Sequence, residues 1–230
     1  MFENILPSLL IPKHIPTTNK KRFGNNGDSG YVLYEPDVRN SSRLISLGCG
    51  NATSFEEDIL SYNKNIVVDI YDINNGCDLA NNNNRVNFHK EKVTNLLKKF
   101  ESKDHVIVQM DIEGSEFDVF QKPLDEEKSK NISQLIIEIH FCMIPNNDHS
   151  IAINLLQNIN EKFDLIHIHG NNNVQSKIGP VPMVIECTYL NKNFNLNLKK
   201  ETNPFPIKNL DYPNFSQFPE HELSWWLQTT

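Results

Sequence analysis

Residues 43–58, RLISLGCGNATSFEED, decide the fold. The stretch begins with a short apolar run typical of a buried strand, and two glycines one residue apart, Gly48 and Gly50, follow it. Thr53, with Glu56 three residues later, has the spacing of a capping box and predicts a helix start. A strand, a glycine turn and a helix in this order let a nucleotide-like ligand approach the backbone closely, although ordinary strand-to-helix turns share the pattern.

Length and composition limit the class of protein. The chain has 230 residues, which is enough for an α/β core, and we expect a single domain. The formal net charge of −7 argues against a nucleic-acid-binding surface, because phosphate contacts require clustered Lys and Arg. No apolar run is long enough to span a bilayer and the N-terminus lacks a signal-peptide pattern, so we expect no membrane insertion.

The cysteines indicate the redox compartment. There are four, Cys49, Cys77, Cys142 and Cys187, and their spacing fits no paired metal site. We therefore expect buried, reduced thiols and a cytoplasmic protein.

Apolar runs alternate with helical patterns along most of the chain. We expect seven strands, at 43–47, 65–72, 85–88, 104–111, 134–140, 163–169 and 182–190. We expect helices at about 53–62, 91–100 and 148–162. This alternation predicts a Rossmann-like α/β fold, with a mostly parallel sheet and helices on both faces. The loop at about 170–181 is too short for a crossover helix, so the last strand should be antiparallel.

The regions on either side of this core, 1–40 and 199–230, are less regular. Asp28 and Tyr31 lie in a turn that leads into a short β-prone piece, which reads as a surface hairpin or as a flap over the ligand site. In the second interpretation both side chains point inward, and we include them among the candidate cofactor-binding residues. The C-terminal region is rich in proline and aromatic residues, and we expect it to pack as an arm over the sheet edge.

Several carboxylates follow predicted strands. Asp69 and Asp72 compete for the tip of the second strand, where a carboxylate about twenty residues past the glycine turn would hold a ribose diol. Asp72 ends the apolar run, so we favour it. Glu116 and Asp118 come later, and we expect them on the solvated face of a helix.

Acid and imidazole side chains also follow later strands. We expect Asp111, His140 and His169 at the tips of neighbouring strands, facing the ligand site. They could form a half-shell for a divalent ion such as Mn²⁺ or Mg²⁺, which Glu113 or Asn171 could complete. The same three residues could instead form a catalytic general-base cluster without a metal.

A series of motifs in this order resembles the FkbM-type S-adenosylmethionine-dependent methyltransferases. The motifs are DSGYVL (28–33), SLGCGNATSFE (46–56), IYD (70–72), MDIEGSEFDVF (110–120), IEIHF (137–141), HIHGNN (167–172) and IECTYL (185–190). The resemblance implies a class I methyltransferase fold in which Gly48 and Gly50 support the methionine part of S-adenosyl-L-methionine and Asp72 holds its ribose. It also implies that Asp111, counted with the cofactor-binding residues, borders the methyl-transfer site with Glu113.

The sequence departs from the commoner family pattern at two turns. Ser29 stands where a second glycine is usual, and Asn51, Ala52 and Thr53 stand where a third glycine often follows. The second departure weakens a dinucleotide interpretation more than a methyltransferase one.

The resemblance also implies a reaction class. Similar proteins usually O-methylate sugars or related precursors, often for surface polysaccharides such as capsules. Some similar sequences occur together with capsule phosphoramidate genes. We therefore expect a small sugar-like or phosphoryl-bearing acceptor, with a divalent metal orienting it. Two alternatives remain: a nicotinamide-dependent oxidoreductase using the same glycine turn, and a cofactor-binding module without catalysis.

Overall fold

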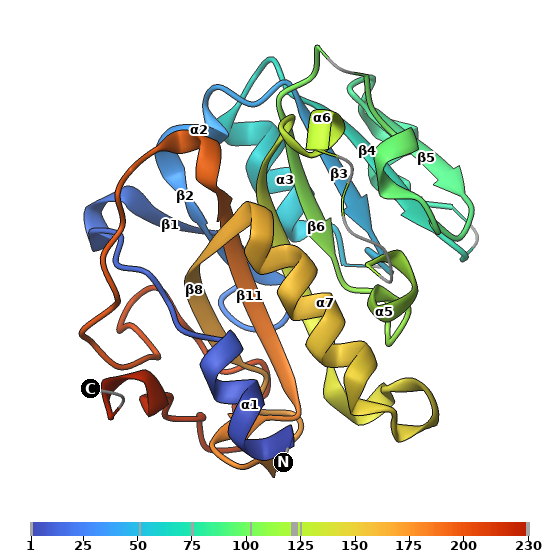
Figure 1. Cartoon of the computed structure of the whole chain (residues 1–230). Coiled ribbons are helices and arrows are strands. Elements are labelled where there is room, and N and C mark those ends of the chain that lie inside the picture. The colour runs from blue at the N-terminus through green and yellow to red at the C-terminus, as the bar shows by residue number, and fades with distance from the viewer. Residues whose placement is uncertain are drawn as a thin grey trace.

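The core of the protein is a seven-stranded sheet (Figure 1). The structure is a computed structural model that describes residues 2–50, 52–74, 76–101, 103–120, 124 and 126–228. The strands of the sheet are β3 (Arg43–Leu47), β4 (Val67–Asp72), β5 (Val86–Lys90), β6 (Val106–Met110), β7 (Ile132–His140), β8 (Phe163–Gly170) and β11 (Val184–Asn191). All seven expected strands are present, with ends shifted by a few residues.

The strand order explains how the sheet is built. The order is β5-β4-β3-β6-β7-β11-β8, and the pairs from β5 to β7 are all parallel. β11 is antiparallel to both β7 and β8, which confirms the expected antiparallel last strand. This strand runs between its two neighbours instead of at the edge of the sheet, so it separates the tips of β7 and β8.

Different elements cover the two faces of the sheet (Figure 1). α7 (His149–Lys162) lies over one face, and α1 (Phe2–Leu9) packs against it. α3 (Ser54–Tyr62) and a hairpin of β1 (Lys20–Gly24) and β2 (Gly30–Tyr34) cover the other face. The expected hairpin is therefore confirmed, and it packs on the sheet because its residues from Tyr31 to Leu33 are buried.

The remaining elements are short. They are α2 (Glu35–Val38), α4 (Asp78–Asn82), α5 (Glu116–Val119), α6 (Glu126–Ser129), β9 (Lys177–Ile178) and β10 (Val181–Pro182). The expected helix over 91–100 is wrong, since this segment has only a 3-10 turn at Leu96–Lys98. Asn95 is extended, with φ −141° and ψ 93°, and asparagine and threonine are weak helix formers. The segment still buries Val93 and Phe100.

The C-terminal arm is part of the core. Phe205 forms an isolated β-bridge with Leu223, and Trp226, fully buried, packs its ring against Phe205. The Trp225 indole N–H donates to the carbonyl oxygen of Leu10, near the N-terminus, at 3.0 Å. The arm, described to residue 228, therefore ties both ends of the chain to the sheet.

The four cysteines are free; three are buried, and Cys142 is exposed, which corrects the expectation that all are buried. Within the part of the chain that the structure describes, none of the helices has the length and apolarity needed to cross a bilayer.

Candidate functional site

A cavity of about 500 Å³ lies beyond the C-terminal ends of β3, β4 and β6. Open α/β sheets bind ligands in this position, at the edge where parallel strands end. The cavity contains most of the candidate residues from the sequence. It is lined by Asp28, Tyr31, Gly48, Gly50, Asp72, Asp111 and Glu113, among others.

Gly48 is the point where three strand tips meet. Its N–H donates to the Tyr71 carbonyl oxygen at 2.9 Å, and the Asp111 N–H donates to the Leu47 carbonyl oxygen at 2.9 Å. A Cβ at position 48 would lie 1.8 Å from the Asp111 carbonyl oxygen, and φ is +80°. Only glycine fits such a close backbone approach at positive φ. The cavity floor therefore consists of backbone, which a ligand can approach closely.

Asp72 is fixed at the tip of β4. Its Oδ2 accepts a hydrogen bond from the Gly50 N–H at 2.9 Å, and its Oδ1 accepts one from the Asn74 N–H at 2.8 Å. The competing Asp69 forms an ion pair with Arg43 and is not among the residues that line the cavity. The geometry agrees with the preference for Asp72. Asn51, the first residue of the unusual turn, lies outside the described residues.

The β1–β2 hairpin supplies one wall of the cavity. Asp28 and Tyr31 both face it, as the flap interpretation expected, and Tyr31 is buried. Ser29, at the departure from the family pattern, has a φ of +61° and also lines the cavity. This turn therefore keeps a conformation that glycine adopts more easily.

A buried polar chain, which the sequence analysis missed, supports the glycine turn. The Gln109 side chain lies 3.3 Å from the Tyr31 hydroxyl and accepts from the Ser46 hydroxyl at 2.9 Å. The Ser46 hydroxyl also contacts a carboxyl oxygen of Glu56. The expected capping box is therefore wrong: Glu56 turns toward the sheet, and Thr53 bonds Glu57 instead. The sequence feature that could have indicated this buried polar chain is Gln109, a polar residue between two apolar residues of a buried strand.

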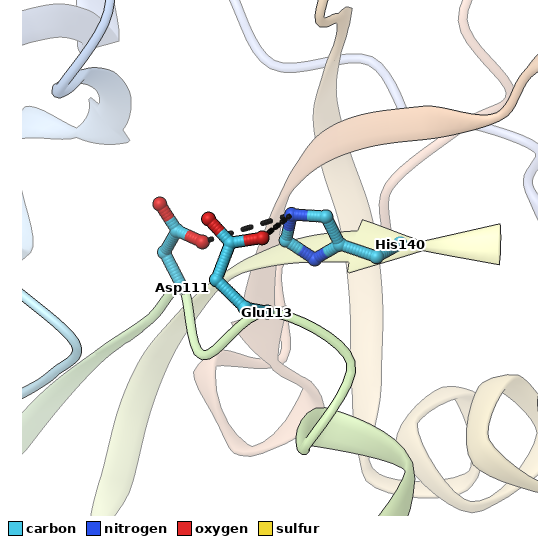
Figure 2. A group of neighbouring side chains, drawn as sticks. All are labelled: Asp111, Glu113 and His140. Atoms are coloured by element: carbon cyan, nitrogen blue, oxygen red, sulfur yellow. Dashed lines mark ion pairs between the residues drawn. The ribbon is translucent and has the colours of Figure 1, made fainter. Parts of the chain in front are cut away.

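Asp111, Glu113 and His140 converge beside the cavity (Figure 2). Nε2 of His140, at the end of β7, lies 3.4 Å from a carboxylate oxygen of Glu113 and 3.9 Å from a carboxylate oxygen of Asp111. One potential ligand atom from each residue lies within 4.8 Å of the other two. The buried Oδ1 of Asp111 has no hydrogen-bond partner. This set of oxygen and imidazole donors suits a divalent cation.

Glu116 holds the His140 ring in place. It is fully buried, so the expectation of a solvated Glu116 is wrong, whereas Asp118 is exposed as expected. Glu116 accepts from the His140 backbone N–H at 2.8 Å and lies 3.2 Å from Nδ1 of its ring. A carboxylate on Nδ1 leaves Nε2 directed at the other two acids, as in many metal-binding histidines.

Burial and neighbouring charges shift the titration of this cluster. Burial raises the pKa of Asp111 to about 6, against the attraction of His140 and together with repulsion from Glu113. Burial lowers the pKa of His140, but hydrogen bonding to Glu116 and the nearby carboxylates outweigh it, so the pKa is raised overall. A metal bound to Nε2 would therefore have to displace a proton.

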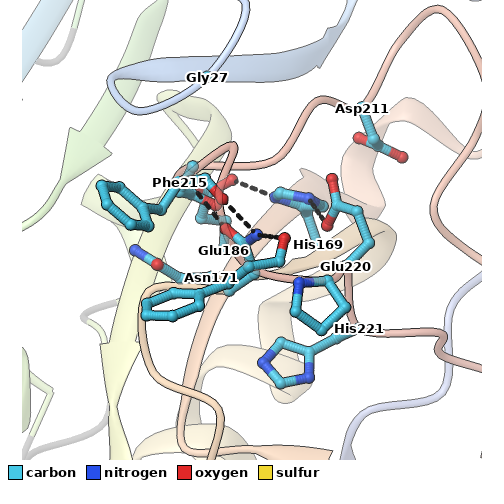
Figure 3. A network of polar contacts seen from close by, with 12 residues as sticks. Gly27, His169, Asn171, Glu186, Asp211, Phe215, Glu220 and His221 are labelled. Atoms are coloured by element: carbon cyan, nitrogen blue, oxygen red, sulfur yellow. Dashed lines mark hydrogen bonds and ion pairs between the residues drawn. The ribbon is translucent and has the colours of Figure 1, made fainter.

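His169 does not join this cluster, which corrects the expectation of three neighbouring tips. β11 separates β7 from β8, so His169 faces Glu186 on β11 instead. Its Nδ1 lies 3.0 Å from Glu186 and its Nε2 lies 3.2 Å from Glu220 of the C-terminal arm (Figure 3). Both ring nitrogens contact carboxylates, so His169 links the C-terminal arm to β11.

A row of polar side chains connects the two histidine sites. Glu138 of β7 is paired in register with Glu186, and Glu186 with His169. Glu138 accepts from the Asn171 amide at 2.7 Å. Burial, then Asp111 and Glu186, raise the pKa of Glu138 well above its usual value, so this carboxyl favours its neutral form. Because side chains alternate along a strand, Glu138 lies on the same face of β7 as His140, two residues further on.

The family model described as "Methyltransferase FkbM domain" matches residues 13–164. No curated protein matches the chain.

Three solved structures illustrate the similarity of shape. The fibrillarin/Nop5p complex has a TM-score of 0.43 at 10% identity, covering 66% of this chain and 74% of that chain. The Methanococcus jannaschii fibrillarin pre-rRNA processing protein has a TM-score of 0.42 at 10% identity, covering 78% and 87%. The plantazolicin methyltransferase BpumL in complex with SAH has a TM-score of 0.35 at 14% identity, covering 66% and 76%. Because these TM-scores lie below 0.5, the structural matches carry no argument. Only the match to the family model supports assigning the chain to a family.

Replacing His169 by Ala is expected to lower the free energy of unfolding by about 3 kcal/mol at neutral pH, because it leaves the buried Glu186 and the partly exposed Glu220 without their cation. Burial lowers the pKa of His169, but Glu186 and Glu220 outweigh it and raise the pKa to about 10. The stabilisation is therefore full below the unfolded pKa of about 6.5 and is lost as pH rises through about 10.

Urea unfolding of wild type and His169→Ala from about pH 6 to pH 10 measures this, and the difference should shrink as pH rises. Lys64→Ala, which replaces an exposed residue of the turn between α3 and β4, is the control and should cost no more than about 0.5 kcal/mol. A difference that stays constant or grows toward pH 10 would contradict the prediction.

Proposed function

The chain belongs to the FkbM methyltransferase family, and on this premise we propose that it is an O-methyltransferase whose donor, S-adenosylmethionine, binds at Gly48 and Gly50. The family match spans residues 13–164, which contain the motifs from DSGYVL (28–33) to IEIHF (137–141), and it confirms the expectation of an S-adenosylmethionine-dependent methyltransferase. What remains a proposal is the placement of the donor, the acceptor class and the metal.

The observation that carries this placement is the fixed carboxylate at the tip of β4. Asp72 lines the cavity, and two backbone N–H groups hold it, at 2.9 and 2.8 Å. Each of its oxygens can accept a further hydrogen bond, as a ribose diol requires. The cavity volume of about 500 Å³ is in the usual range for small-molecule sites, and Ile73 and Val93 supply apolar lining.

Methyl transfer requires alignment more than activation. When bound, S-adenosylmethionine supplies a sulfonium methyl group: the acceptor oxygen forms a bond to that carbon while the carbon–sulfur bond breaks and its electron pair stays on sulfur. The protein must hold the acceptor in line and accept the proton of its hydroxyl. Asp111 borders both the cavity and the His140 cluster, so it stands where that proton is released.

The acceptor, by the family resemblance, is a small sugar-like or phosphoryl-bearing precursor, in a surface-polysaccharide pathway and in the cytoplasm. The acceptor would lie on the side of Asp111 away from Asp72, because the donor occupies the other side.

Asp111, Glu113 and His140 would hold a divalent ion such as Mn²⁺ or Mg²⁺. The fit rests on ligand atoms within 4.8 Å of one another and on Oδ1 of Asp111, which is buried and has no hydrogen-bond partner. When bound, the ion would lower the pKa of the acceptor hydroxyl and orient it. Without a metal, His140 would serve as the base, because both ring nitrogens of His169 are engaged, and a His140→Ala change would abolish turnover while leaving donor affinity intact.

The donor placement predicts the effect of Asp72→Asn. The change keeps the shape of the side chain but removes a charged acceptor for the ribose, which is worth about 1.5–3 kcal/mol, so affinity for S-adenosylmethionine should fall roughly 10- to 100-fold. Isothermal titration measures it, with Asp78→Asn, an exposed acid in the first turn of α4, as control. Unchanged affinity in Asp72→Asn, or a preference for NAD over S-adenosylmethionine, would refute the placement.

The metal placement predicts stoichiometric Mn²⁺ binding, read by electron paramagnetic resonance. Glu113→Gln and His140→Ala should each weaken it at least about 10-fold, because each removes a ligand. Asp118→Asn, which alters an exposed acid on the following helix, should bind Mn²⁺ as the wild type does. Wild-type protein that binds no Mn²⁺ and keeps full activity in EDTA would rule the metal out.

A further inference from the structure

The loop between β1 and β2, residues 25–29, contributes to the wall of the cavity. Asp28 and Ser29 of this loop line the cavity. Three of the five loop residues are exposed, and the strand pairing on which the loop stands ends at Gly24 and Gly30. The position of the two wall residues therefore depends on contacts that other parts of the chain make with the loop.

The side chain of Arg22, on β1, holds this loop. Its Nε donates to the Asn25 carbonyl oxygen at 2.7 Å, and its Nη2 donates to the Gly27 carbonyl oxygen at 2.6 Å. A Cβ at position 30 would lie 2.7 Å from Nη2, so glycine at this position leaves room for the guanidinium. Because a guanidinium presents its donors in a rigid planar fork, the two bonds fix the loop carbonyl groups relative to each other.

The same guanidinium also contacts the C-terminal arm. Its Nη1 donates to the Leu210 carbonyl oxygen at 3.3 Å, and its Cζ lies 5.5 Å from the centroid of the Tyr212 ring. Figure 3 shows Gly27 next to the ribbon of the arm, and a Cβ on Gly27 would lie 3.5 Å from the Pro213 carbonyl oxygen. Arg22 therefore joins the arm to a loop whose side chains line the cavity.

Two further contacts to the loop are longer. The Ser54 hydroxyl lies 3.4 Å from the Ser29 carbonyl oxygen, and the Asn214 amide nitrogen lies 3.4 Å from Oδ1 of Asp28. Hydrogen bonds of this length are weak. The two short bonds from Arg22 therefore contribute most to holding the loop.

The arm has anchors that do not involve Arg22. The fully buried Asn172 donates to the carbonyl oxygens of Phe215 and Phe218, both at 2.9 Å. Asp211 pairs with the buried His167 at 2.7 Å. The arm should therefore stay on the sheet when Arg22 is replaced, so that such a variant tests the connection between arm and loop.

A connection of this kind links two equilibria. If the loop keeps its position in the wall only while Arg22 holds it to the arm, a ligand that contacts the wall binds the connected form more tightly. Linkage is reciprocal, so the bound ligand must also stabilise the contact between loop and arm. This effect would reach the arm although none of its described residues lines the cavity.

We propose that Arg22 is a positioning residue for the donor site, which joins the C-terminal arm to the β1–β2 loop and thereby holds Asp28 and Ser29 in the cavity wall. Donor binding and the contact of residues 210–214 with the loop are then linked. The inference rests on the proposed function, because it takes the donor to occupy this cavity.

The first test is calorimetric titration of the full chain with S-adenosylhomocysteine. Arg22→Ala should weaken binding about tenfold, because a loop that is in place about a tenth of the time raises the apparent Kd by that factor. Arg22→Lys, which keeps the charge but not the fork, should fall between Arg22→Ala and the wild type. Arg39→Ala, which removes an exposed arginine paired with Glu35, is the control and should bind within about twofold of the wild type. Fluorescence of Trp225 and Trp226 should show the arm still docked in all variants.

The second test separates linkage from a general loosening of the fold. Measured by hydrogen exchange and mass spectrometry, S-adenosylhomocysteine should slow amide exchange in residues 24–30 and also in residues 210–214 of the wild type. In Arg22→Ala the protection of residues 210–214 should be lost, while that of the glycine turn at 47–50 remains. The effects of Arg22→Ala and Asp28→Ala on affinity should be less than additive in the double variant, because Arg22 acts through the loop.

Two results would overturn the proposal: Arg22→Ala binds S-adenosylhomocysteine as the wild type does, or the ligand protects no amide of residues 210–214 in the wild type. If Arg22→Ala does not fold, Arg22→Lys carries the same test. Wild-type protein that binds no S-adenosylhomocysteine would refute the donor site itself, and the linkage with it, whereas intact binding without protection of the arm refutes only the role of Arg22.

Discussion

The structure depends on the contact between two strand tips at Gly48. A side chain there would place Cβ 1.8 Å from the Asp111 carbonyl oxygen, so β3 and β6 can approach only because residue 48 is glycine. The contact fixes the floor of the cavity and sets the end of β6. It thereby places Asp111 on the far side of the glycine turn from Asp72, which Gly50 holds.

Asp111 divides the site into two halves of different character. On the Gly48 side the walls combine backbone, apolar side chains and several carboxylates, of which Asp72 is held by two backbone N–H groups, and this suits a nucleoside that carries a cationic sulfonium. On the other side buried carboxylates dominate, and burial raises the pKa of both Asp111 and Glu138. A carboxyl with a pKa of about 6 can take up a proton near neutral pH, and nearby Glu138 favours its neutral form. The lining thus changes at Asp111 from a mixed pocket to an acidic wall. This change fits the proposed donor on one side and a hydroxyl acceptor on the other.

The sequence predicted what depends on local patterns. The apolar runs gave all seven strands, and the short loop after β8 gave the antiparallel β11, because strand periodicity and loop length are properties of neighbouring residues. Asp72 could be chosen over Asp69 because it ends its run. The order of the strands is not local: nothing in the sequence indicates that β11 lies between β7 and β8, and this order moves His169 away from His140.

Two other residues show why burial was harder to predict than position. Glu56 and Glu116 stand near helix starts, where acids usually face solvent, yet both are buried. Their partners, Ser46 and His140, come from distant strands, so the reason for their burial is tertiary. The arm is similar, since its anchors on Asn172 and His169 form only once the sheet is assembled.

We propose that the donor rests on the backbone at Gly48 with its ribose on Asp72. The decisive experiment is a crystal structure of the protein with S-adenosylhomocysteine. It should show ribose hydroxyls within hydrogen-bonding distance of both Asp72 oxygens and the sulfur between Gly48 and Asp111. A nucleoside bound elsewhere, with Asp72 bonded only to Gly50 and Asn74, would contradict it.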